Sequence, residues 1–370
     1  MAEQQRIRVA VVFGGRSSEH AISCVTAGSV LAAIDTERYE VVPVGIATDG
    51  RWVLATADPA ELAIADGRLP EVDGSGPALA LPLDARPGGL LVHTPGAIPS
   101  ALGEVDVVLP LLHGPYGEDG TIQGLLELAD VRYVGSGVFA SAAAMDKAHM
   151  KTVLAGNGLE CGPYTVVSDR AWRTEPKRVR DDIAALGFPV FVKPSRAGSS
   201  IGISKVDGPD ELDAAIEAAR AHDLKVIVEA AVSGREIECG VLEGRDGGAA
   251  EASLPAGIEI SGDHAFYDFE SKYLGEGSSL TIPAELPAGV TERVRQLAVR
   301  AFDALGCEGL ARVDFFYTDD GRVLINEVNT MPGFTPSSAF PQMWAATGVD
   351  YPALVDRLLQ TALRRPLGLR

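Results

Sequence analysis

The chain has 370 residues, of which 46% are hydrophobic and 22% charged, which is typical of a folded protein with two or three domains and ample core. Its formal net charge of −19 argues against nucleic acid as the main partner. No apolar run reaches the ~20 residues of a membrane span, the N-terminus lacks a signal-peptide core, and the four cysteines form no CxxC pair. We therefore expect a cytoplasmic protein without a membrane partner and with reduced cysteines.

Predicted strands and helices alternate through the first third of the chain. The strands are expected at residues 7–13, 39–47 and 105–112, and the helices at residues 19–34 and 120–130. This alternation is typical of a doubly wound parallel sheet, so we expect an N-terminal α/β domain over residues 1–134. Residues 56–104 are rich in Pro, Gly and Ala, and we expect them to form an insertion with short strands at most.

From about Tyr133 the pattern changes to α+β. A long helical stretch from Gly137 to Leu154 is followed by short strands and helices, and we expect a central lobe over residues 135–229. A C-terminal lobe over residues 230–370 should follow it. Its expected elements are a strand at 235–244, a helix at 290–305, a hairpin at 309–333 and a helix at 351–363.

The hairpin at residues 309–333 is the most informative segment, and its turn is expected at Asp319-Asp320-Gly321. Because strand side chains alternate between faces, Arg312 and Asp314 share one face, and Asp314 should lie opposite Glu327. Asn329 shares the face of Glu327. Two carboxylates and an amide oxygen, without His or Cys, suit Mg²⁺ or Mn²⁺, and such an ion usually works with substrate phosphates. A solvent-facing hairpin with ordinary surface charges is the alternative.

A loop of small residues, Lys193 to Gly202, lies between two predicted strands. Such loops present backbone N–H groups to anions, and Lys193 could reach a phosphate. The stretch Gly198 to Gly202 also fits the G-x-S-x-G pattern of serine hydrolases. That pattern needs a helix after the serine, whereas a strand-like segment follows here, so a hydrolase is disfavoured.

Lysine is scarce in this chain, with seven lysines against 25 arginines. Three lysines fall in motif-like contexts, namely Lys147, Lys193 and Lys272. The other four are expected on the surface or on helix faces, namely Lys151, Lys177, Lys205 and Lys225. The strand that ends at Glu229, together with Glu236, could bind a purine or a ribose, although an ordinary strand end is the default interpretation.

Seven segments occur in an order that resembles the D-alanine–D-alanine ligases of the ATP-grasp superfamily. They are FGGRSSEHAIS (13–23), HGPYGEDGTIQG (113–124), MDK (145–147), FVKP (191–194), GSSIG (198–202), FYDFESKY (266–273) and the hairpin segment 312–333. The resemblance covers about residues 7–363. It implies an N-terminal substrate-binding domain followed by a two-lobed ATP-grasp module. It also implies a homodimer that makes D-alanyl-D-alanine through a D-alanyl phosphate, for peptidoglycan precursor synthesis.

The resemblance also implies which residues bind ATP and metal. The implied ATP-binding residues are Lys147, Lys193, Ser200, Glu229, Ala231, Val232, Glu236, Phe266 and Lys272. Lys272 would lie on a mobile loop, residues 262–278, that closes over the γ-phosphate. Asp314, Glu327 and Asn329 would bind two Mg²⁺ or Mn²⁺ ions.

Further residues are implied for the amino-acid substrates. Glu19 would take the ammonium of the first D-alanine and would form a hydrogen-bonded set with Ser199 and Tyr273. His113 would line the amino-acid pocket, and Ser338 would bind the second carboxylate. Arg312 and the N–H of Gly333 would form the oxyanion site. Without the resemblance, Glu19 could simply cap its helix and His113 could be structural.

Two alternatives remain beside the dipeptide ligase. An enzyme of the same fold could make D-alanyl-D-lactate or D-alanyl-D-serine, but Tyr273 favours the dipeptide because depsipeptide enzymes lack this loop tyrosine. A non-catalytic nucleotide-binding relative would have lost some of the chemistry-bearing residues. All six of these residues are present in this chain, namely Lys193, Lys272, Arg312, Asp314, Glu327 and Asn329.

Overall fold

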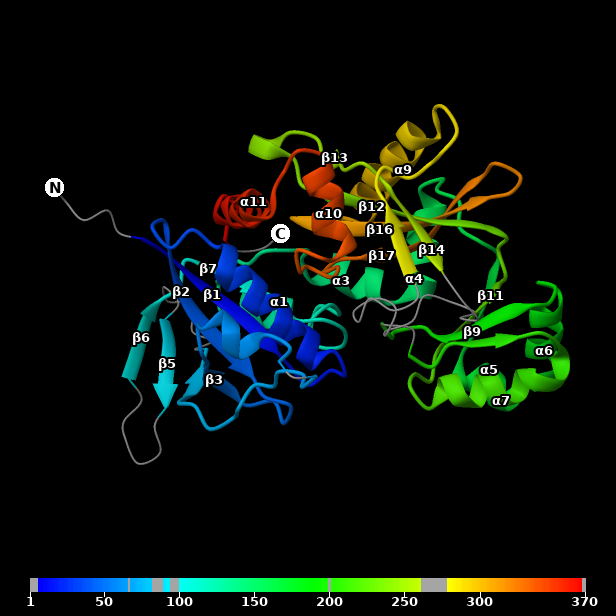
Figure 1. Cartoon of the computed structure of the whole chain (residues 1–370). Helices are drawn as coiled ribbons and strands as arrows, with labels where there is room; N and C mark the ends of the chain where they lie inside the picture. Colours follow the sequence, from blue (N-terminus) through cyan, green and yellow to red (C-terminus); the bar gives the residue numbers. More distant parts are fainter. Residues whose placement is uncertain are drawn as a thin grey trace.

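The computed structural model of the chain describes residues 6–65, 67–81, 89–93, 100–198, 201–260 and 278–367. Three β-sheets follow one another along the chain, and helices pack against each of them (Figure 1). The α-helices are α1 (His20–Ala33), α2 (Thr121–Leu128), α3 (Val138–Met145), α4 (Lys147–Gly156), α5 (Asp169–Thr174), α6 (Pro176–Ala184), α7 (Pro209–Arg220), α9 (Val290–Leu305), α10 (Ala339–Ala346) and α11 (Tyr351–Leu363). Within the ranges above, none of these helices is both long enough and apolar enough to cross a membrane.

The first sheet has seven strands in the order β6-β5-β4-β3-β2-β1-β7. They are β1 (Ile7–Gly14), β2 (Tyr39–Ile46), β3 (Trp52–Leu54), β4 (Ala78–Ala80), β5 (Gly89–His93), β6 (Ser100–Glu104) and β7 (Val107–Pro110). β1 pairs in parallel with β2 and β7, while β2 to β6 pair antiparallel with one another. The predicted α/β domain and its parallel strands β2, β1 and β7 are therefore confirmed, while β3 to β6 extend the sheet with antiparallel pairings. Three of these short strands, β4 to β6, lie in the segment expected as an insertion.

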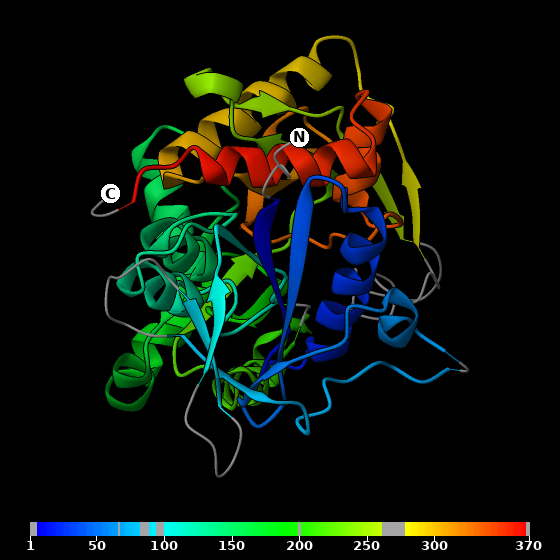
Figure 2. The same ribbon diagram turned by 90° about the vertical axis from the view of Figure 1, so that its left-hand side faces the viewer.

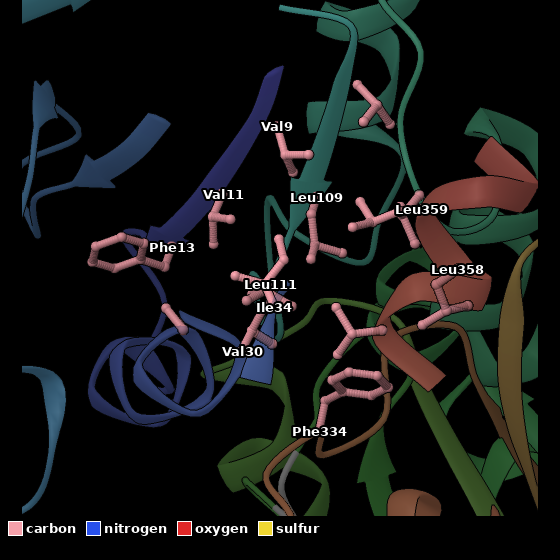
Figure 3. Close-up of a cluster of buried hydrophobic side chains, with 14 of the residues drawn as sticks. Val9, Val11, Phe13, Val30, Ile34, Leu109, Leu111, Phe334, Leu358 and Leu359 are labelled. Carbon is pink, nitrogen blue, oxygen red and sulfur yellow. The ribbon is translucent and has the colours of Figure 1, made fainter. Parts of the chain in front are cut away.

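The core of the first sheet is divided between its two faces. Val9, Val11 and Phe13 of β1 pack in one cluster with apolar side chains of α1 and α11 (Figure 3). The intervening residues Ala10 and Val12 belong to a separate cluster with α2, as alternation along a strand requires. Helix α11, from the far end of the chain, thus lies beside the first sheet (Figure 2).

The second sheet has four antiparallel strands in the order β10-β9-β11-β8. They are β8 (Tyr164–Val167), β9 (Val190–Pro194), β10 (Ser204–Val206) and β11 (Val226–Ala230). Apolar side chains of α5, α6 and α7 bury one face of this sheet in a single cluster. The other face, with Lys193 and Glu229, is turned to a cleft.

The third sheet contains the predicted hairpin. Its strands are β12 (Gly234–Leu242), β13 (Glu251–Ala252), β14 (Ala256–Ile260), β15 (Ser278–Thr281), β16 (Leu310–Thr318) and β17 (Val323–Asn329). Strands β16 and β17 form the hairpin, in which Asp314 pairs with Glu327 and Arg312 pairs with Asn329. The register shifts between Asp314 and Phe315. The predicted hairpin and its pairing are confirmed, whereas the β-bulge was not predicted.

The predicted long helix from Gly137 to Leu154 is wrong at one point, because the structure has two helices, α3 and α4. Between them Asp146 is extended, with φ −89° and ψ 98°, and its side chain accepts a hydrogen bond from the backbone N–H of His149. Asp146 is thus the N-cap of a new helix, a role for which aspartate is favoured. The break places Lys147 at the first position of α4.

Candidate functional site

The candidate site is a cleft between the second and third sheets. Strands β9 and β11 form one side, and strands β12, β16 and β17 form the other, with the start of α4 between them. The cleft brings together eight residues that the sequence singled out, namely Lys147, Lys193, Glu229, Val232, Glu236, Asp314, Glu327 and Asn329. They come from five different strands, one helix and the loop between β11 and β12, so the fold itself assembles the set.

Glu229 lies at the centre of a network with two lysines. Lys193 Nζ is 2.5 Å from Glu229 Oε2, and Lys151 Nζ is 2.8 Å from Glu229 Oε1. Burial alone would raise the pKa of the Glu229 carboxyl, but the two ammonium groups outweigh burial and hold that pKa well below its usual range. Glu229 is therefore ionised. Lys151, which the sequence predicted on a helix face or on the surface, lies on helix α4 but is buried.

Lys147 connects the two sides of the cleft. Its Nζ is 2.9 Å from Glu327 Oε1 on the third sheet and donates to the carbonyl of Ala197, at 2.8 Å, in the loop after β9. Its backbone N–H donates to the carbonyl of Ser195, and Ser195 Oγ in turn donates to the N-cap carboxylate of Asp146. The position of the Lys147 ammonium is thus fixed by the helix break and by the loop.

The β16–β17 end of the cleft carries the acidic groups. Arg312 donates two hydrogen bonds to the Asp314 carboxylate, at 2.7 and 2.8 Å, and Asn329 Nδ2 donates to the same group at 3.0 Å. Arg312 Nε also lies 3.3 Å from Glu238 Oε2. Glu238, which lies opposite Asp314 on β12, was not singled out from the sequence. Glu238 lies two residues after Glu236 on the same strand, so both side chains are on one face, and this spacing could have identified it from the sequence.

The donor set at this end suits a hard cation. Asp314, Glu327 and Asn329 offer carboxylate and amide oxygens in the part of the cleft where Lys147 contacts Glu327. Over the described ranges, no three His, Cys, Asp or Glu side chains gather as a ready metal cluster. The set consists of two carboxylates and one amide. A cation held by these three groups would have further coordination positions, which substrate phosphates could fill.

Glu19 and His113 lie together at the edge of the first sheet. Glu19 is the N-cap residue of α1, yet its side chain makes no capping hydrogen bond. A Cβ atom added at Gly114 would lie 2.6 Å from Glu19 Oε2, and one added at Gly198 would lie 3.3 Å from the same oxygen. The Glu19 carboxylate thus sits between the loop after His113 and the loop after β9. His113 is buried, which lowers the pKa of its imidazole, while the charge of Glu19 opposes that shift.

Two loops meet at His113 and Met331. The His113 ring Nδ1 is 3.3 Å from the Met331 carbonyl, and Glu118 accepts hydrogen bonds from the backbone N–H groups of Gly114, at 2.5 Å, and Met331. Burial, reinforced by the nearby charge of Glu19, raises the pKa of Glu118 to about 8. Glu118 is a second residue that the sequence reasoning missed, although it lies inside the HGPYGEDG segment.

We expect Glu118→Gln to make stability less dependent on pH. The unfolded carboxyl, with its ordinary pKa of 4.5, ionises before the folded one, whose pKa is about 8. The wild-type protein therefore loses stability relative to the variant as pH rises from 4.5 to 8, by about 5 kcal/mol, and the difference is constant above that window. Urea unfolding of both proteins at pH 5, 7 and 9 measures this. A constant difference across the three pH values would contradict the assignment.

The remaining predicted residues lie around the cleft or outside the described ranges. Gly333 and Ser338 follow β17 in the loop before α10, where Ser338 Oγ accepts a hydrogen bond from the Thr335 N–H at 3.1 Å. The Ala231 N–H donates to the Pro189 carbonyl at 3.1 Å. Five residues lie outside the described ranges, namely Ser199, Ser200, Phe266, Lys272 and Tyr273, as does the expected loop 262–278 up to the start of β15.

Two family models cover most of the chain. The model described as D-ala D-ala ligase N-terminus matches residues 8–136, and the model described as D-ala D-ala ligase C-terminus matches residues 153–360. Among curated relatives, the D-alanine–D-alanine ligase of Kineococcus radiotolerans is 61% identical over 100% of both chains. The enzyme of the same name from Mycobacterium ulcerans is 57% identical over 99% of this chain and 98% of its own length.

Solved structures agree with these matches. The VanG D-Ala:D-Ser ligase of Enterococcus faecalis superimposes with a TM-score of 0.83 at 34% identity, covering 97% of this chain and 100% of that one. The D-alanine–D-alanine ligase of Coxiella burnetii superimposes with a TM-score of 0.80 at 33% identity, covering 97% of this chain and 94% of that one. Both likenesses extend over the three sheets and the cleft.

Proposed function

The chain belongs to the D-alanine–D-alanine ligase family, and from this membership and its cleft we propose that it joins two D-alanines at the expense of ATP. The products would be D-alanyl-D-alanine, ADP and phosphate. The observation that carries the proposal is that Lys147 and Lys193 line one cleft together with the carboxylates of Asp314 and Glu327. Cations and metal-binding oxygens in one cleft suit the phosphates of a nucleotide.

The reaction requires activation of a carboxylate, which is a poor acyl donor. An oxygen of the first D-alanine carboxylate attacks the γ-phosphorus of ATP, ADP leaves, and a D-alanyl phosphate forms. The deprotonated amine of the second D-alanine then attacks the acyl carbon, and phosphate leaves. Lys147 and Lys193 would neutralise phosphate charge during the first transfer. Arg312 and the Gly333 N–H would donate to the oxyanion of the second step.

A divalent cation fits the oxygen donors of this site. Asp314, Glu327 and Asn329 would hold Mg²⁺ or Mn²⁺, and such ions supply charge stabilisation to the transferring phosphoryl group. Arg312 would keep the Asp314 carboxylate oriented through its paired hydrogen bonds. Asn329 would orient the same carboxylate from the neighbouring strand.

The amino-acid pocket is proposed beside Glu19. Glu19 is only 5% exposed, and its carboxylate lies against Gly114 and against Gly198, which lies in the loop after β9 and lines the cleft. From there it would hold the ammonium of a substrate whose carboxylate faces the γ-phosphate. His113 would close this pocket from the side of the first sheet. Ser199 and Tyr273 would complete the hydrogen-bonded set with Glu19, and Ser338 would bind the carboxylate of the second D-alanine. The residues proposed to contact ATP from the remaining loops are Ser200, Phe266 and Lys272.

The choice of the second substrate has two candidates. The relatives that are 57% and 61% identical carry the name D-alanine–D-alanine ligase, whereas the D-Ala:D-Ser ligase is 34% identical. The dipeptide D-alanyl-D-alanine is therefore the proposed product, and D-alanyl-D-serine is the second candidate.

The proposal also includes the assembly and location of the protein, which is proposed to be a cytoplasmic homodimer of 38.7 kDa subunits. Light scattering would measure the mass of this dimer.

Purified protein with ATP and Mg²⁺ should release phosphate with D-alanine and at least about tenfold less with L-alanine. Holding the ammonium at Glu19 and the carboxylate at the γ-phosphate fixes two substituents of Cα, so inversion drives the methyl group into the pocket wall. D-lactate should be a poor second substrate near neutral pH, because its hydroxyl is a weaker nucleophile than an amine. Coupled phosphate release and mass spectrometry of the product measure both. Equal rates with D- and L-alanine would overturn the proposal.

A further inference from the structure

Lys151 is a fully buried lysine that the proposed reaction does not use. It lies one helical turn after Lys147 on α4, and only 2% of it is exposed. Its Nζ is 2.8 Å from Glu229 Oε1 and donates to the carbonyl of Asn326 at 3.3 Å. A buried ammonium is costly unless it is paired, so its burial calls for a reason beyond helix packing.

Glu229 divides its two carboxylate oxygens between two lysines of different character. Lys193, on Oε2, lines the cleft. Lys151, on Oε1, is buried behind Glu229 and does not line the cleft. Only Lys193 can therefore turn toward a bound phosphate while Lys151 stays where it is.

The charge balance changes when Lys193 moves. If the Lys193 ammonium turned from Glu229 to a phosphate and no other cation were present, Glu229 would be a buried carboxylate without a counter-ion. Such a state is strongly unfavourable. Lys151 prevents this state. Burial would lower the pKa of Lys151, but the charge of Glu229 outweighs burial and raises that pKa, so the ammonium stays protonated.

We propose that Lys151 is a positioning residue, the resident counter-ion of Glu229 that leaves Lys193 available to the phosphates of the nucleotide. The inference rests on the proposed function of the cleft as an ATP site. It explains why the network has two lysines for one carboxylate. It also separates the two lysines by role, because Lys193 contacts the ligand and Lys151 acts through Glu229.

The test compares ATP with adenosine in Lys151→Met, which keeps an unbranched side chain of similar length without its charge. In this variant Lys193 is the cation that remains beside Glu229, so its hydrogen bond to a phosphate should weaken. Binding of ATP should therefore weaken by about tenfold, as expected for weakening one hydrogen bond to a charged group. Adenosine, which has no phosphate, should bind within about twofold of the wild-type affinity. Titration calorimetry of both ligands measures this. Lys177→Met, on the exposed face of α6, is the matched control and should change neither affinity.

A second comparison uses Glu229→Gln, alone and combined with Lys151→Met. Once the carboxylate is neutral, removal of Lys151 should have no further effect on ATP binding. This pair of variants decides the question if Lys151→Met alone does not fold. Equal weakening of ATP and adenosine in Lys151→Met, or weaker ATP binding in the double variant than in Glu229→Gln, would overturn the inference. Failure of the wild-type protein to bind ATP would instead overturn the proposed function.

Discussion

Glu327→Gln should fold normally and lower ligation by at least about a hundredfold at ordinary Mg²⁺ concentrations, because a hard cation loses one of its two charged ligands. The Glu327 side chain is 26% exposed, so its neutralisation should not disturb the core. Lys147 also loses its charged partner at 2.9 Å, which changes the charge of the cleft. Steady-state phosphate release over a range of Mg²⁺ concentrations measures the effect, and excess Mn²⁺ should restore part of it.

The matched control for this prediction is Glu292→Gln on α9. Glu292 is exposed, and its carboxylate contacts two residues of the same helix, Arg295 at 3.0 Å and Gln296 at 3.2 Å. This control should keep the wild-type dependence on Mg²⁺. Wild-type turnover of Glu327→Gln at low Mg²⁺ would remove Glu327 from the metal site.

Arg312→Met should both unfold more easily and lose turnover. Arg312 is the cation shared by Asp314 and Glu238, and its own side chain is only 11% exposed. Removing it leaves two neighbouring carboxylates without that cation, which should lower the free energy of unfolding by about 3 kcal/mol. Turnover should fall by at least about a hundredfold, because an oxyanion donor is lost as well. Denaturant unfolding and phosphate release measure the two effects separately.

Arg312→Lys separates charge from geometry. A lysine keeps the positive charge but cannot make the paired hydrogen bonds to Asp314, so stability should recover in part while turnover stays low. Arg322→Met is the matched control on the same hairpin, since Arg322 pairs with Asp320 at the exposed turn. It should cost about 0–1 kcal/mol and leave turnover unchanged. A loss in the control as large as in Arg312→Met would contradict a special role for Arg312.

The sequence was most informative where local rules decide the structure. Alternation along two strands and an Asp-Asp-Gly turn were enough to predict that Asp314 faces Glu327, and the register of β16 and β17 agrees. The parallel strands β1, β2 and β7 of the first sheet were predictable from another local pattern, the alternation of strands and helices along the chain. The break between α3 and α4 was not predicted, although Asp146 has the side chain of an N-cap. Its helical surroundings concealed the signal.

The sequence was least informative where distant charges meet. Lys151 looks like a surface lysine on an amphipathic helix, and only the approach of α4 to β11 shows that it is buried against Glu229. Glu118 looks like one acidic residue in a loop, and its pKa is raised first by burial and then by the charge of Glu19 from another part of the chain. Such pairings depend on tertiary packing, which local periodicity does not contain.

The most direct test of the central claim follows the oxygen of the substrate carboxylate. With D-alanine labelled by ¹⁸O in its carboxylate, ATP and Mg²⁺, activation by phosphoryl transfer predicts one ¹⁸O atom in each phosphate released. The new peptide carbonyl should retain the other ¹⁸O atom of the first D-alanine. Mass spectrometry of the phosphate and of the dipeptide reads both. Unlabelled phosphate, or label found in AMP, would contradict the assignment of the cleft as a site of acyl phosphate formation.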